Sequence, residues 1–174
     1  MEPKGYFPYY ENLEVIAEID IRGRFMMMAC DLEWSLFCIM LYCNAFNPKK
    51  VRRYKKMMMA QKIDCTIADL KHYNMNYFLE FEDSFDMLEE FKELRNYFGH
   101  CRMRFEEGQK PSYFEVFYVD EVNGQEKILT KQFTIEYIKD AVNRFRKQQM
   151  VFVGLVSRLQ QEFLLKNAEQ QEFF

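Results

Sequence analysis

The sequence predicts an all-α protein: an antiparallel helical bundle of four to five main helices with one small β-hairpin inserted near residues 113–133. Three observations support this prediction. Apolar residues recur at steps of three and four over long stretches, which is the spacing of one helical face. Only 6 glycines and 4 prolines occur in 174 residues, too few for the many tight turns of a β-sandwich or barrel. One Asn-Gly pair, a strong hairpin signal, separates two runs of strand-forming residues.

Length and composition predict one domain, residues 1–174, because no linker rich in proline, glycine or serine divides the chain. Hydrophobic residues make up 49% and aromatic residues 17% of it. This exceeds the need of a small core, so we expect part of it to form a subunit interface. The net charge of -3 and the pI of about 5.6 exclude a strongly basic protein, so any nucleic-acid contact must come from a local patch.

The cysteines predict a reducing compartment. There are five: Cys30, Cys38, Cys43, Cys65 and Cys101. Their odd number, the lack of a CxxC pair and the lack of a secretory signal favour reduced thiols in the cytoplasm. The uncharged stretch from Trp34 to Asn47 is too short to span a bilayer, which takes roughly 20 residues. We therefore expect no membrane span.

Residues 11–46 contain no proline and predict a long first helix. From Phe25 to Phe46 it is hydrophobic almost all round, which is typical of a helix at the centre of a bundle or in a subunit interface. Glu33 has two interpretations: a carboxylate on a solvated strip, or an accessory acid that faces Arg95. We favour the first.

A basic cluster opens the next predicted helix, where Asn47 can cap and Pro48 suits the first helical position. Its six members are Lys49, Lys50, Arg52, Arg53, Lys55 and Lys56. Such a run is either a solvated face or, in an acidic protein, a local positive field that attracts phosphates. The sequence leaves both open. The residues assigned to RNA phosphates on the second interpretation are Lys49, Arg52, Arg53 and Lys56.

The first of the two histidines, His72, lies where a buried stripe gives way to a loop predicted by Asn74 and Asn76. It has no acidic or cysteine neighbour at ligand spacing. We therefore expect a surface or capping residue and not a metal ligand.

The second histidine, His100, lies on a helix predicted from Phe78 to Phe105. An apolar stripe at steps of three and four defines this helix: Phe78, Phe81, Phe85, Leu88, Phe91, Leu94, Phe98, Cys101 and Phe105. At about 100° per residue, Asn96 and His100 fall within about 40° of each other on the opposite side, away from the core. Arg95 lies between the two faces, and its guanidinium can reach an imidazole one turn along.

The segment after this helix breaks the helical pattern. Residues 113–119 are strand-forming, and Asn123-Gly124 favours a two-residue turn. That turn would set Val122 opposite Gln125 and Tyr118 opposite Leu129. Thr134 then caps a last helix, whose stripe comprises Ile138, Ala141, Phe145, Phe152, Leu159 and Phe163.

Several enzyme classes are excluded by motifs that the chain lacks. It has no GxGxxG, P-loop, GxSxG or HExxH motif and no Cys/His array with zinc spacing. The acidic set from Glu80 to Glu93 lacks the ordered Asp/His pattern of a metal nuclease and is most simply a solvated face. We expect neither a metal nor a cofactor.

Arg95, Asn96 and His100, called the trio below, suit phosphate chemistry. Histidine can take and give a proton near neutral pH. Arginine supplies a permanent charge and a forked donor array that fits a phosphate and its transition state. Asparagine can orient the imidazole or donate to a non-bridging oxygen. Together they suit metal-independent RNA cleavage, in which the ribose 2′-hydroxyl is the nucleophile.

The run Leu94-Arg95-Asn96-Tyr97-Phe98-Gly99-His100 resembles the R-(polar)-x(3–5)-H signature of HEPN domains, a family of nucleotide-binding helical bundles. A polar residue follows the arginine, a small residue precedes the histidine, and the gap of four lies within the family range. The likeness extends to a long apolar first helix with Leu32-Glu33-Trp34 and to a closing helix. The resemblance thus extends over most of the chain, although only the motif itself is distinctive.

This resemblance implies a homodimeric endoribonuclease that brings two copies of the motif together and cuts RNA without a metal, leaving a cyclic phosphate and a 5′-hydroxyl. Many such proteins are toxins or antiphage effectors. Arg102 and Arg104 directly follow the motif and are either phosphate contacts or ordinary surface arginines. The hairpin departs from the minimal bundle, with dimerisation, substrate choice or partner binding as its candidate roles.

Two other functions stay open. One is a catalytically inactive HEPN-like module that binds RNA or nucleotide, or pairs with an antitoxin or a separate nucleotidyltransferase, since this chain has no transferase motif. The other is a helical adaptor on which Arg95 and His100 are incidental surface residues.

Overall fold

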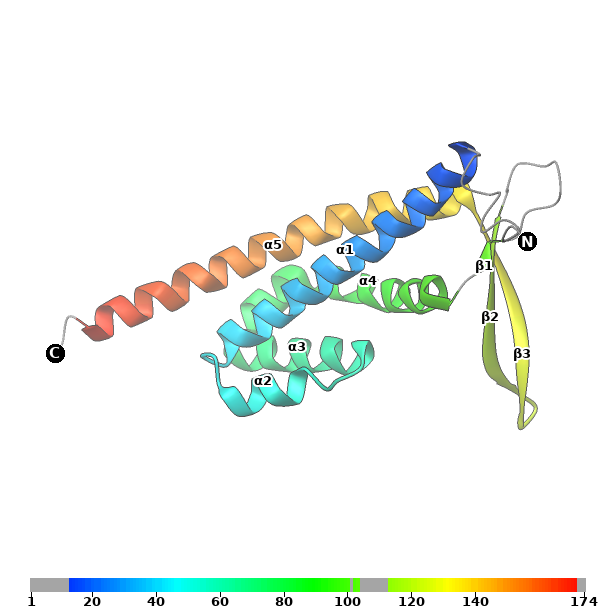
Figure 1. The fold of residues 1–174 in the computed structure, drawn as a ribbon. Helices are drawn as coiled ribbons and strands as arrows, with labels where there is room; N and C mark the ends of the chain where they lie inside the picture. The colour runs from blue at the N-terminus through cyan, green and yellow to red at the C-terminus, as the bar shows by residue number, and fades with distance from the viewer. Residues whose placement is uncertain (1–12, 101, 104–112, 172–174) are drawn as a thin grey trace, which may run out of the picture. The chain divides into compact units, whose positions relative to one another are not determined.

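A computed structural model describes residues 13–100, 102–103 and 113–171, with side chains placed over 22–99, 115–119 and 123–168. Within these residues the chain forms five helices and a small antiparallel sheet, which confirms the predicted all-α bundle with an inserted hairpin. In chain order the elements are α1 (Leu13–Cys43), α2 (Pro48–Tyr54), α3 (Met59–Tyr73), α4 (Met75–His100), β1 (Arg102–Met103), β2 (Tyr113–Val122), β3 (Gln125–Thr134) and α5 (Ile135–Gln171) (Figure 1).

The chain divides into two compact units. Unit 1 comprises Met1–Met27 and Leu94–Arg144, and unit 2 comprises Met28–Glu93 and Phe145–Phe174. Unit 1 therefore contains the sheet and the end of α4 that carries the trio. Unit 2 contains α2, α3 and most of the helical core.

Aromatic side chains of α4 and α5 form the core of unit 2. The ring centroids of Phe85 and Phe152 are 5.1 Å apart, and those of Phe91 and Phe145 are also 5.1 Å apart. Both pairs meet edge to face, the arrangement that the charge distribution of aromatic rings favours. Most of the predicted stripe in this unit is thus confirmed as buried, whereas Phe81 and Phe163 are only partly buried.

Helix α1 is buried on one side only. Leu32, Leu36 and Ile39 are fully buried, whereas the Trp34 side chain is 64% exposed. Of the two locations expected for this helix, the centre of a bundle therefore holds for one side only, and a subunit interface on the exposed side stays a prediction. Ser35, a polar exception in this stretch, is buried and donates a hydrogen bond to the Asp31 carbonyl at 3.1 Å.

The segment Arg22–Cys43 of α1 is the one stretch within the described residues that is long and apolar enough to cross a membrane. The core helix of a soluble protein has the same length and composition. Two of its carboxylates have polar partners in unit 2: Glu33 forms an ion pair with Lys62, and Asp31 accepts a hydrogen bond from Gln149 at 3.2 Å. A soluble protein is consistent with these features.

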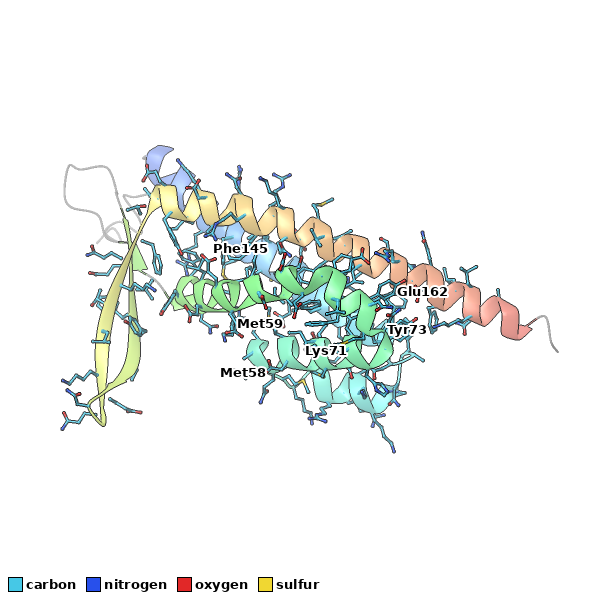
Figure 2. The ribbon with its side chains drawn as sticks, turned by 180° about the vertical axis from the view of Figure 1, so that it is seen from behind. Met58, Met59, Lys71, Tyr73, Phe145 and Glu162 are labelled. Atoms are coloured by element: carbon cyan, nitrogen blue, oxygen red, sulfur yellow. The ribbon has the colours of Figure 1, made fainter. Side chains whose placement is uncertain are left out.

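Local capping signals are confirmed at α2. The Asn47 side chain accepts a hydrogen bond from the backbone N–H of Lys49 at 3.0 Å, and Pro48 is the first helical residue. Helices α2 and α3 lie side by side (Figures 1 and 2), joined by a hydrogen bond between the hydroxyls of Tyr54 and Thr66 at 3.3 Å.

Helix α3 is tied to α5 through Tyr73. Its hydroxyl donates to a Glu162 carboxylate oxygen at 2.9 Å and accepts a hydrogen bond from Lys166 at 2.9 Å. Figure 2 shows Tyr73 and Glu162 close together. His72 is exposed in the last turn of α3, as predicted for a surface residue.

The hairpin of unit 1 has the predicted register. Val122 pairs with Gln125 and Tyr118 with Leu129, and the strand order is β1-β2-β3. Asn123 and Gly124 form the turn with φ of 57° and 74°, the left-handed values that a tight hairpin turn requires. The two long strands form a ribbon (Figure 1). Thr134 then caps α5 by accepting from the Tyr137 N–H at 3.1 Å.

Helix α4 ends earlier than predicted. It ends at His100, and Arg102 and Met103 form β1, paired antiparallel with Glu115 and Phe114 of β2. The expectation of one helix through Phe105 is therefore wrong, because a short strand pairing with a distant segment replaces the last predicted turn. The stripe residues Cys101 and Phe105 lie outside the described residues.

Candidate functional site

The candidate site is the last turn of α4 in unit 1. Leu94 and Phe98 anchor this turn: both are buried, and Phe98 is fully covered. Asn96 is exposed and Arg95 is half-buried, which confirms that these two polar side chains lie off the apolar stripe. The Arg95 guanidinium donates to the Asn96 amide oxygen at 3.4 Å. The two groups are thus adjacent and reachable from solvent.

His100 is the last residue of α4. It follows Asn96 by four residues, which is about 6 Å along a helix axis and about one full turn. The helical backbone therefore brings the third member of the trio onto the same side as Asn96. Its side chain lies outside the described residues.

An arginine that the sequence did not single out holds the end of this helix. The Arg22 Nε of α1 donates a hydrogen bond to the backbone carbonyl of Phe98 at 3.1 Å. The last carbonyls of a helix lack partners within the helix and carry partial negative charge, so a cation is favourable there. Arg22 thus fixes the backbone on which the trio lies. No local sequence signal reveals it, because the two residues are 76 positions apart.

A cleft that we call the hairpin cleft adjoins Asn96. Its volume is about 430 Å³, and it is lined by Asn96, Tyr97, Val116, Phe117, Tyr118, Val119 and Ile128. The rings of Tyr97 and Tyr118 are 5.6 Å apart, and the Lys131 ammonium lies 5.0 Å from the Tyr97 ring centroid. The sequence predicts the strands of the hairpin, but no pattern in it connects them to the trio.

The basic cluster lies in unit 2. The side chains assigned to phosphate contact, Lys49, Arg52, Arg53 and Lys56, are all exposed. Arg53 and Lys56 line a second cleft of about 640 Å³, called the basic cleft, whereas Lys49 and Arg52 do not. Lys50 also lines it but is paired with the nearly buried Asp69 at 2.7 Å. Arg53 and Lys56 add two positive charges to this cleft, and the carboxylate of Asp64, which also lines it, offsets one of them.

A thiol also lines the basic cleft. Burial, and then the neighbouring Asp69 carboxylate, raise the pKa of Cys65. A thiol with a raised pKa stays protonated at neutral pH and is a poor nucleophile. Cys65 is therefore not a candidate nucleophile in this cleft.

The remaining candidates fall in three places. Glu33 lies in unit 2, where its carboxylate is paired with Lys62. Arg102 is in β1, with its backbone paired to Glu115; its side chain, like the whole of Arg104, lies outside the described residues. Among the described residues, no three His, Cys, Asp or Glu side chains gather as a metal-binding group.

Comparison of the chain with models of protein families, with curated proteins and with solved structures gives no match.

Proposed function

We propose that this protein is a metal-independent endoribonuclease that acts as a homodimer in the cytoplasm, as a toxin or an antiphage defence effector. The observation that carries the proposal is the pairing of Arg95 and Asn96 at the solvent side of the last turn of α4, with His100 one turn further. Neither the Arg95 nor the Asn96 side chain is buried in the core, so both are available to bind a ligand.

The reaction needs one proton acceptor, one proton donor and stabilisation of charge on a phosphate. His100 removes the proton of a ribose 2′-hydroxyl, and the 2′-oxygen attacks the adjacent phosphorus. The bond from phosphorus to the 5′-oxygen breaks, and that oxygen takes up a proton from water, giving a 2′,3′-cyclic phosphate and a 5′-hydroxyl. Arg95 neutralises the extra negative charge on the phosphate oxygens, and Asn96 donates to one of them.

A homodimer fits the exposure of Asn96 and the partial exposure of Arg95, because a second copy would bring its own Arg95 and His100 to the same RNA. The basic cluster supplies contacts to other phosphates of the strand through Arg53 and Lys56, which line the basic cleft. Such contacts strengthen binding without reading sequence and weaken as salt increases. The resemblance to HEPN domains is the reason for preferring a toxin or defence role, with an antitoxin as the expected protein partner.

Cleavage of a mixed RNA pool in EDTA tests the proposal. Wild type should cut, and Arg95→Ala and His100→Ala should each lose at least about 100-fold in rate, the usual contribution of a general acid or base or of one transition-state donor. Two matched controls lie on exposed helical positions: His72→Ala in α3 and Arg146→Ala in α5 should cut like wild type.

Three other outcomes would contradict the proposed nuclease or its assigned site. If wild type binds the pool but does not cut it, the chain is an RNA-binding module. If wild type neither binds nor cuts, the trio consists of surface residues of a helical adaptor. If the controls lose as much activity as the two trio variants, the site lies elsewhere in the protein.

A further inference from the structure

Unit 2 contains a cleft beside Trp34 that the proposed reaction does not use. Its volume of about 310 Å³ falls in the range of about 300–1,000 Å³ that small-molecule sites occupy. Helices α1, α2 and α3 and the residue that follows α2 supply its lining, and we call it the tryptophan cleft. Three rings and three charged side chains line it: Trp34, Phe37, Tyr54, Glu33, Lys55 and Lys62.

The Trp34 ring is open to a ligand. Its side chain is 64% exposed. Phe37 is the one described residue whose ring contacts it, with centroids 5.5 Å apart and the two planes tilted by 44°. Phe37 in turn contacts the buried Tyr54 ring, also at 5.5 Å. Phe37 and Tyr54 therefore hold the back of the cleft together, and Trp34 is left to stack on a bound group.

The charges at the cleft favour an anion. Glu33 and Lys62 are paired and cancel each other. Lys55 is exposed and forms no ion pair with any described residue. One free positive charge beside an open aromatic ring fits a nucleotide, in which a flat base and a phosphate are joined through one ribose.

The tryptophan cleft is also continuous in sequence with the basic cluster. Lys55 belongs to that cluster, whose six side chains are all exposed. Only Lys50 among them is paired with a described carboxylate, that of Asp69. Cations that follow a backbone, next to an aromatic ring on which a base stacks, are the arrangement that binds single-stranded nucleic acid.

The Glu33–Lys62 pair offers partners to the edge of a base. Lys62 contacts one carboxylate oxygen of Glu33, so the second oxygen can still accept, and the ammonium has further N–H groups to donate. Each RNA base has a donor next to an acceptor on its Watson–Crick edge. The pair therefore requires an unpaired base but does not select which base it is.

We propose that the tryptophan cleft and the basic cluster bind single-stranded RNA, with one unpaired base stacked on Trp34 and its phosphate at Lys55. This rests on the proposed function only for the choice of RNA, since an acidic peptide with an aromatic residue shares the same flat ring and negative charge. A base inside a duplex has neither a free face nor a free Watson–Crick edge, so the duplex does not fit.

The chain offers a direct readout, because Trp34 is its only tryptophan and its fluorescence reports on this cleft. The probe is a short oligoribonucleotide with 2′-O-methyl riboses throughout. Its blocked 2′-oxygens cannot attack the phosphate, so binding is measured without cleavage. Wild type should bind this strand with quenching of Trp34. The same strand annealed to its complement, and an abasic strand of equal length, should not quench it.

Variants of Trp34 test the stack, with binding measured by the fluorescence anisotropy of a dye-labelled strand. Trp34→Leu should weaken binding by about 5- to 150-fold, the loss of one base stack. Trp34→Phe keeps a ring and should restore most of the affinity. The matched control is Phe46→Leu: Phe46 is 43% exposed and outside the cleft, and its change should leave binding unaltered.

A variant of Lys55 tests the phosphate contact. Lys55→Gln should lower the slope of log binding constant against log salt concentration by about 0.7, the effect of one phosphate contact on a single strand. Lys147→Gln is the matched control, since Lys147 is an exposed lysine of α5 in the same unit. It should leave the slope unchanged.

The proposal is overturned if a saturating strand leaves Trp34 fluorescence unchanged, if the duplex or the abasic strand quenches it equally, or if Trp34→Leu binds like wild type. If an acidic peptide with one phenylalanine quenches Trp34 and the strand does not, the cleft belongs to a protein partner. If Trp34→Leu converts a dimer to a monomer in light scattering, a second copy covers the ring and the base site is wrong.

Cleavage of unmodified RNA in EDTA separates this proposal from the proposed function. Quenching by wild type without cleavage retains the base site and removes the nuclease. Cleavage by wild type without quenching of Trp34 retains the nuclease and removes the base site.

Discussion

Gly99 is the residue that separates Phe98 of the core from His100 of the trio. It is exposed and helical, and a Cβ added to it would meet nothing within 4 Å outside its own helical neighbours. The folded chain therefore has no steric need for glycine here, and helical glycine costs about 0.5–1 kcal/mol relative to alanine. Close approach of RNA or of a second subunit is a reason to keep it.

Gly99→Ala should therefore raise the free energy of unfolding by about 0.5–1 kcal/mol and lower the rate of RNA cleavage. Urea denaturation and the cleavage assay measure the two effects. Gly154→Ala is the matched control, since Gly154 is also exposed, helical and free of contacts at an added Cβ; it should raise stability and leave cleavage unchanged. A Gly99→Ala protein that is more stable and equally active would show that no partner approaches this position.

Cys43 makes the stability depend on pH. Burial, and then the Asp69 carboxylate, raise its pKa from 9.0 to about 12. The folded chain thus keeps a proton that the unfolded chain releases, so this contribution to stability is complete below pH 9 and is lost as the pH rises toward 12. Between about pH 8 and about pH 10, the free energy of unfolding should fall less in Cys43→Ala than in wild type. Equal declines in urea titrations would contradict the burial of this thiol.

At the scale of elements, the hairpin depends on one glycine. Gly124 has φ of 74°, and an added Cβ would contact nothing within 4 Å, so an alanine there meets backbone strain alone. Gly124→Ala should lower the free energy of unfolding by about 1–2 kcal/mol, the cost of a left-handed residue with a Cβ. In thermal unfolding, Gly124→Ala should lower the midpoint temperature, whereas Gly154→Ala, at a helical position, should raise it. A neutral effect would mean that the turn relaxes to another type.

The same elements show which features the sequence could predict. The hairpin register follows from the Asn123-Gly124 turn, and the caps at Asn47 and Thr134 follow from residues within three positions, so local chemistry determines each. The end of α4 could not be predicted, because the apolar period continues while β1 pairs with the distant strand β2.

The candidate site also has one part that the sequence predicts and another that it does not. The trio follows from helical spacing, and the exposure of Asn96 agrees with it. The Arg22 contact and the hairpin cleft depend on contacts between segments far apart in the chain. No periodicity in one segment encodes them.

At the scale of the whole molecule, the proposed composite site requires two copies of the chain. Unit 2 exposes large apolar side chains beyond the needs of its core, such as Leu165, which is 64% exposed. We expect light scattering at micromolar concentration to give twice the chain mass of 21.3 kDa. A strict monomer with full nuclease activity would contradict a composite site, while the chemistry assigned to a single trio would remain.

In the proposed reaction the trio cuts RNA by attack of a ribose 2′-hydroxyl without a metal. The most direct measurement compares, in EDTA, an RNA strand of known cleavage position with the same strand carrying one 2′-deoxyribose at that position. Wild type should cut the first strand, leave a cyclic phosphate and a 5′-hydroxyl, and spare the second strand at that position, while Arg95→Ala and His100→Ala should spare both. Equal cleavage of the two strands, or products with a 5′-phosphate, would contradict the mechanism.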